Sequence, residues 1–131
     1  MSGFRIAGTA LHHKLCHVLG GTFDLPHAEV HTIVLPHATA YNREGAPAAM
    51  ARIAHALDAE DAAGGLFDLA AALGARQALS KFGLRESDLD RAADLAVQSP
   101  YPNPTPLTRD RIRSLLDAAF HGRRPAGARP A

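Results

Sequence analysis

Apolar residues recur every three or four positions along most of this 131-residue chain, in short segments separated by glycine and proline. That spacing places apolar side chains on one face of a helix, whereas a half-buried strand needs strict alternation. Leucine and alanine supply most of these positions, as in Leu11, Leu15 and Leu19. The pattern predicts an all-α fold, a helical bundle of about six helices.

Capping and breaking residues indicate where these helices begin and end. Asp61, Ser87 and Thr108 each precede an apolar periodic segment, as N-cap residues do. Gly20 and Gly21 follow the first segment and predict its end. The helices expected from these signals cover residues 8–19, 47–57, 61–73, 87–97 and 108–121.

The segment His27 to Tyr41 allows two interpretations. Val30, Val34 and Ala38 suit a buried helix, in which Pro36 would remove one backbone hydrogen bond and kink the axis. Residues 32–35 also form a short β-branched run that could be a strand. We favour the kinked, buried helix.

Composition is consistent with one domain. Hydrophobic residues make up 47% of the chain, enough for a core, and aromatic residues only 5%. We expect a helical domain over residues 1–121 and a disordered, solvated tail over residues 122–131. Four prolines between Ser99 and Pro106 predict an extended connector before the last helix.

Charge and cysteine usage exclude several classes of protein. The formal net charge is only +1. Lysine and arginine are not clustered as they are in proteins that bind nucleic acid, so we expect no nucleic-acid partner. No stretch reaches the roughly 18 apolar residues that a membrane span needs. Cys16 is the single cysteine, so no internal disulfide can form. We expect a cytoplasmic protein without a membrane anchor.

Histidines are concentrated near the N-terminus. Of eight in the chain, six lie between His12 and His37. His13 and His17 are four residues apart, as are His27 and His31, so each pair shares one helix face. A turn between antiparallel helices would bring the two pairs together. Neutral imidazole binds divalent metals and also transfers protons near neutral pH.

Two interpretations of these histidines remain open from spacing alone. A buried histidine is most often a hydrogen-bonded core residue, whereas two pairs on adjacent helices favour a functional site. No carboxylate is placed as a general base beside them. We expect Cys16 to face the core, His12 and His37 to be structural, and the role of His31 to stay undecided.

The histidine segment resembles a known family. The quoted residues are His12-His13-Lys14-Leu15-Cys16-His17-Val18-Leu19-Gly20-Gly21, then Phe23-Asp24-Leu25-Pro26-His27-Ala28-Glu29, then Leu35-Pro36-His37-Ala38 and Tyr41-Asn42. They are similar to the C-terminal helical half of maleylacetate reductases, in the iron-containing alcohol dehydrogenase superfamily. Residues 90–96 and 103–107 also fit the closing helices of that family.

The resemblance implies roles for three histidines. Metal-dependent members hold their metal with one aspartate and three histidines, two of which match His13 and His27. The remaining two ligands would precede the residues present here. The resemblance places His17 near the substrate as a catalytic proton donor. Some maleylacetate reductases work without metal, and His13 and His27 would then bind the substrate.

The implied reaction is reduction of maleylacetate, a small dicarboxylate, to 3-oxoadipate by NADH or NADPH in aromatic degradation. The family binds this cofactor with an N-terminal α/β domain, and we expect that domain to be absent here. Fe²⁺, Zn²⁺ or no metal would complete the site. We therefore expect the chain to be inactive alone and to need a nucleotide-binding partner chain. We also expect a homo-oligomer formed through an exposed apolar face. The alternative is a non-catalytic helical module that binds metal or a partner.

Overall fold

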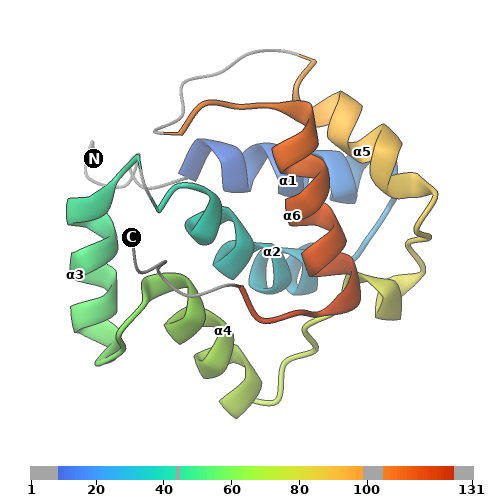
Figure 1. Ribbon diagram of the computed structural model, residues 1–131. Coiled ribbons are helices and arrows are strands. Elements are labelled where there is room, and N and C mark those ends of the chain that lie inside the picture. The colour runs from blue at the N-terminus through green and yellow to red at the C-terminus, as the bar shows by residue number, and fades with distance from the viewer. Residues whose placement is uncertain (1–8, 44, 99–104, 126–131) are drawn as a thin grey trace.

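The computed structural model describes residues 9–43, 45–98 and 105–125, and these fold into helices joined by short loops (Figure 1). No strand occurs among the described residues, so the all-α prediction is confirmed. The six α-helices found there also match the predicted number. They are α1 (Thr9–Thr22), α2 (His27–Tyr41), α3 (Pro47–Leu57), α4 (Ala62–Ala72), α5 (Asp88–Ala96) and α6 (Arg109–His121), with a 3₁₀ turn, η2 (Leu79–Phe82), between α4 and α5.

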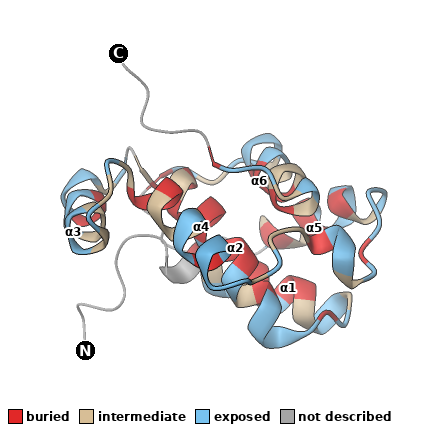
Figure 2. Ribbon diagram, turned by 90° about the horizontal axis from the view of Figure 1, so that it is seen from below, coloured by how far each residue is buried: buried red, intermediate tan, exposed pale blue. Residues whose placement is uncertain are grey.

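Helix α2 is the centre of the domain. It packs against α1, α4 and α6, while α5 joins the core through α1 and α6. Figure 2 shows buried residues concentrated where α1, α2, α5 and α6 face one another, and α3 lies at one end. The largest fully buried side chains include Leu15, Ile33, Leu89, Ile112 and Leu116. Helices α1 and α2, which carry the six histidines between His12 and His37, are therefore packed into the main core.

The helical interpretation of residues 27–41 is confirmed, and the strand alternative is wrong. Helix α2 runs without interruption through Pro36, which is itself buried. Thr39 donates its hydroxyl hydrogen bond to the carbonyl of Leu35 at 2.8 Å, one turn back. The β-branched residues Val30, Ile33 and Val34 thus lie on a buried helix face, where packing outweighs their strand propensity.

The predicted end of the first helix is wrong. Helix α1 continues through Gly20 and Gly21 to Thr22. The chain reverses at Asp24, which has a φ of 58°, and the amide of Leu25 donates to the carbonyl of Leu19 at 3.3 Å. An aspartate tolerates this left-handed conformation, so the turn does not need the glycines.

Two of the three predicted N-caps are confirmed. The Asp61 carboxylate accepts a hydrogen bond from the amide of Gly64, and the Thr108 hydroxyl accepts one from the amide of Arg111. Ser87 precedes α5 but makes no side-chain capping bond. The next residue, Asp88, accepts from the amide of Arg85 instead, at 3.0 Å. A carboxylate near a helix start also complements the helix dipole.

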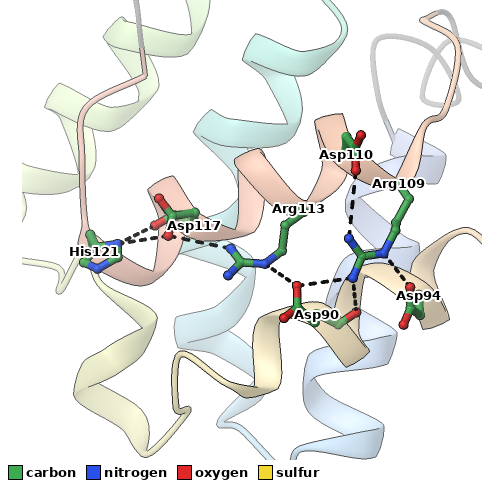
Figure 3. Close-up of polar contacts among 7 residues, drawn as sticks. All are labelled: Asp90, Asp94, Arg109, Asp110, Arg113, Asp117 and His121. Carbon is green, nitrogen blue, oxygen red and sulfur yellow. Dashed lines mark hydrogen bonds and ion pairs between the residues drawn. The ribbon is translucent and has the colours of Figure 1, made fainter.

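Ion pairs join α5 to α6 along their exposed edge (Figure 3). Arg109 contacts Asp94 at 2.6 Å and Asp90 at 3.2 Å, and Arg113 contacts Asp90 at 2.9 Å. Hydrogen bonds from Arg113 and then Arg109 hold the pKa of the Asp90 carboxyl below its usual value. Because these groups lie in solvent, we attribute to them a small contribution to stability.

The first residues of the predicted tail belong to the fold. Arg123 pairs with Asp117 at 2.8 Å, Arg124 pairs with Asp68 of α4 at 3.0 Å, and Pro125 is buried. Residues 126–131 lie outside the described residues, as do residues 99–104 of the predicted connector. None of the described helices has the length and apolar character required to cross a bilayer.

Candidate functional site

Four histidines form one cluster where α1 contacts α2. His31 is its centre: its ring lies 4.5 Å from that of His27, 5.0 Å from that of His12 and 6.5 Å from that of His13, centroid to centroid. The turn between the two helices brings these side chains together. The spacing predicted that His17 would join them, but His12 lies in the cluster instead. His13 and His27 are exposed, whereas His12 and His31 are partly buried. The cluster therefore has a solvent side and a core side.

His27 and His31 also contact each other through ring nitrogens. The two Nε2 atoms are 3.2 Å apart, one helical turn along α2. Burial lowers the pKa of His31, and the neighbouring His27 and His13 lower it further by charge repulsion. The N–H of one ring can donate to the nitrogen of the other, so His31 is placed to orient the His27 ring.

His12 is fixed by the backbone of α2. Its Nε2 lies 3.1 Å from the carbonyl oxygen of His31. A carbonyl oxygen only accepts, so Nε2 carries the hydrogen and Nδ1 of the neutral ring is left with a lone pair. Burial is the main cause that lowers the pKa of His12, which favours this neutral form.

Cys16 lies on the core side of the cluster, one turn after His12. It is buried, and burial raises the pKa of its thiol to about 12, so the group is a protonated thiol. The ligating atoms of His12, Cys16 and His31 all lie within 4.8 Å of one another. Cys16 was expected only as a core residue, so this grouping was not predicted. The His12–Cys16 spacing of four residues was the signal that could have indicated it.

His17 and His37 stand apart from the cluster in the described part of the chain. His17 is exposed on α1, one turn after His13, and no ring contact joins it to the other four. His37 is buried against Phe67 of α4, where its Nε2 has no hydrogen-bond partner among the described residues. Burial lowers the pKa of His37 to about 4. His37 thus belongs to the core, as expected.

Two hollows beside α2 are not bordered by the predicted site residues. One, of about 590 Å³, runs beside the start of α2 and is bordered by Glu29, Thr32, Arg76 and Phe82. Another, of about 290 Å³, lies between α2 and α4 and is bordered by Leu35, Leu66, Leu69 and Leu73. The histidines His13, His17 and His27 instead lie on open surface. Their exposure leaves all three rings accessible to a ligand.

Comparison with known sequences identifies the domain. The C-terminal domain pattern of the Fe-containing alcohol dehydrogenase family matches residues 1–120. The chain belongs to this family. The helical architecture and the histidine segments that suggested the resemblance are therefore those of its C-terminal domain.

Several relatives within the family are maleylacetate reductases. The maleylacetate reductase of Burkholderia cepacia is 56% identical over 116 residues, which are 88% of this chain and 33% of that protein. The crystal structure of maleylacetate reductase from Agrobacterium tumefaciens superposes with a TM-score of 0.84 at 50% identity, over 88% of this chain and 33% of that one.

A crystal structure of a putative alcohol dehydrogenase from Ralstonia eutropha JMP134 gives a TM-score of 0.86 at 60% identity, again over 88% of this chain and 33% of that one. The 131 residues thus span about a third of the length of the proteins they match. The resemblance to maleylacetate reductases that the histidine segments suggested is confirmed at the level of the family and of its named members.

Proposed function

We propose that this domain forms the helical wall of the active site of an NAD(P)H-dependent reductase that acts on maleylacetate. The observation that carries the proposal is the exposed histidine surface of α1 and α2, in a chain 56% identical to the corresponding third of a maleylacetate reductase. The nucleotide would be held by residues outside these 131, because no strand and phosphate loop occurs in the described part of the chain.

His17 is the proposed proton donor. When bound, NAD(P)H supplies a hydride to the carbon–carbon double bond of maleylacetate, and the other carbon of that bond must take a proton. His17 is exposed on α1, so a substrate can reach its ring. Imidazole is a common general acid in enzymes, and an exposed ring can recover the donated proton from solvent.

His13 and His27 are the proposed ligands of a metal or of a substrate carboxylate. Both are exposed, and both lie against His31 in one cluster, so they fit as two of the ligands that hold Fe²⁺ or Zn²⁺. Imidazole nitrogen is a normal donor for either ion. Without metal, the same two rings in protonated form would bind a dianionic substrate.

Exposed leucines are consistent with a surface that contacts either the rest of the enzyme or a second copy of this domain. Leu69 of α4 and Leu73, which directly follows that helix, are 47% and 77% exposed, and Leu35 of α2 beside them is 38% exposed. Together with the hollow between these helices they form an apolar surface, and such surfaces commonly mediate association. We propose a nucleotide-binding partner region and a homo-oligomer on this basis.

A chimera tests the proposed function. Residues 1–120 of this chain would replace the matching third of the Burkholderia cepacia maleylacetate reductase, and NADH oxidation would be followed with maleylacetate as substrate. The proposal predicts turnover well above that of the same protein without the C-terminal third. A chimera that folds and binds NADH yet shows no maleylacetate-dependent oxidation would refute it.

A further inference from the structure

We propose that His12, Cys16 and His31 form a second metal site on the core side of the histidine cluster. It would bind a divalent ion that takes a thiolate ligand, such as Zn²⁺. None of its three residues is among the proposed catalytic groups, and the proposal does not depend on the proposed reductase function. It rests on three independent features of the structure: ligand spacing, the hydrogen bond of His12, and the burial of the thiol.

The first feature is spacing. The three candidate ligand atoms lie within 4.8 Å of one another. In a tetrahedral zinc site, nitrogen and sulfur ligands lie roughly 3.3 to 3.8 Å apart, given metal bonds of about 2.0 to 2.3 Å. Small side-chain rotations of about an ångström therefore suffice to reach coordination distance. His12 and Cys16 come from one face of α1, and His31 approaches from α2.

The second feature is the hydrogen bond that His12 already makes. Histidine ligands in metal sites commonly donate the other ring N–H to a carboxylate or a backbone carbonyl, which fixes the ring and its tautomer. The Nε2 of His12 is held in this way by the carbonyl of His31 at 3.1 Å. The remaining nitrogen, Nδ1, carries the lone pair that a metal needs.

The third feature is the position of Cys16. Its side chain is 2% exposed, and it faces the two partly buried imidazoles. Thiolate prefers zinc and similar soft or borderline ions over magnesium or calcium. On binding, the S–H bond breaks, a sulfur–metal bond forms, and the proton passes to solvent, so no oxidant or reductant is required. A water molecule would complete the fourth position.

Cobalt substitution provides the test, because Co²⁺ occupies zinc sites and absorbs strongly in the near ultraviolet only when a thiolate is a ligand. The full 131-residue chain would be titrated with CoCl₂ without oxygen, then with ZnCl₂ as competitor. We expect one Co²⁺ per chain with a thiolate-to-cobalt band that Zn²⁺ removes. Cobalt bound without this band, or no cobalt bound, would overturn the proposal.

Variants assign the ligands. Cys16→Ser should abolish the band, and His31→Gln should weaken cobalt affinity by about 10-fold or more. His55→Gln on α3, an exposed histidine outside the cluster, is the matched control and should leave the band unchanged. His13→Gln should also retain the band, which separates this site from the proposed outer pair. Circular dichroism verifies that each variant is helical, and a band that persists in folded His31→Gln with native affinity would contradict the assignment.

Discussion

The Nε2 atom of His31 lies 3.2 Å from the Nε2 atom of His27, so the one histidine whose role the sequence left undecided touches a proposed ligand. His31 lies one turn after His27 on α2. Its backbone carbonyl accepts a hydrogen bond from the ring of His12. The ring of His27 is exposed, and this contact holds one of its nitrogens. His31 therefore acts as a positioning residue for the exposed side of the cluster.

Replacing His31 should impair the reaction through His27. In the chimera described above, His31→Ala should lower kcat/KM for maleylacetate by about 10- to 100-fold, the usual cost of removing a group that orients a ligand. The Kd for NADH should not change, because the nucleotide binds elsewhere. His55→Ala is the control. Steady-state kinetics within twofold of the unmodified chimera would show that His31 does not position His27.

Acid should destabilise the domain through His37. Burial lowers the pKa of His37 from 6.5 to about 4 in the folded state. As the pH falls through this interval the unfolded chain takes up a proton that the folded chain does not, so stability is lost. At about 1.4 kcal/mol for each pKa unit, the loss amounts to roughly 3 kcal/mol.

The substitution His37→Leu keeps the volume and removes the titrating group. Its free energy of unfolding, measured with urea, should therefore rise relative to the native chain as the pH falls from neutral toward about 4. Removal of a buried Nε2 atom that lacks a partner should not reduce stability at neutral pH. A constant difference across this pH interval would show that His37 is not the cause of acid sensitivity.

Among the polar residues, Asp61 is expected to contribute strongly to the stability of the fold. It caps α4 through the amide of Gly64 at 2.9 Å and binds Arg43 with both oxygens, at 2.9 and 3.0 Å. Both side chains of the ion pair are largely buried. Asp61→Ala should lower the free energy of unfolding by about 2 to 3 kcal/mol, because it removes a cap and leaves a guanidinium partly buried.

Two matched variants separate the contribution of the cap from that of the ion pair. Asp61→Asn keeps the cap and removes the charge, so it should lose less than Asp61→Ala by about 1 kcal/mol. Glu60→Ala, at the exposed neighbouring position, should change stability by less than about 0.5 kcal/mol. Urea titrations in parallel make the comparison. Equal losses for the alanine and asparagine variants would mean that the ion pair, and not the cap, carries the effect.

Exposed leucines at the end of α4 should control self-association. Leu69 and Leu73 place apolar surface in solvent. The double variant Leu69→Ser/Leu73→Ser should reduce the average mass measured by light scattering toward that of a single chain, with little loss of helix content. Ala71→Ser, also exposed on α4, is the control. A native chain that is already monomeric at high concentration would contradict this account of the surface.

Sequence periodicity was sufficient for the fold but not for the details of the site. Helix α3 begins and ends where predicted, and Asp61 and Thr108 cap as predicted, because these features depend on local residues. The end of α1 was misplaced because glycines at residues 20 and 21 are tolerated inside a helix when the turn is formed by Asp24. The turn η2 carries no periodic signal and was not predicted.

The cluster itself was predicted only in part. Spacing alone indicated that the pairs His13/His17 and His27/His31 would meet, but the structure groups His12 and His31 with Cys16 and leaves His17 to one side. Which face of α1 packs on α2 depends on the whole core, including Leu15 and Ile33, and not on the histidines. The roles of His13, His17 and His27 remain predictions carried by the family resemblance.

The most direct test of the central claim is the kcat of the chimera with and without His17. The account predicts that His17→Gln lowers kcat for maleylacetate reduction by about 10²- to 10⁴-fold, as loss of a general acid does, while the Kd for NADH stays the same. A His17→Gln chimera that turns over maleylacetate at the unmodified rate would contradict the claim that this helical surface donates the proton.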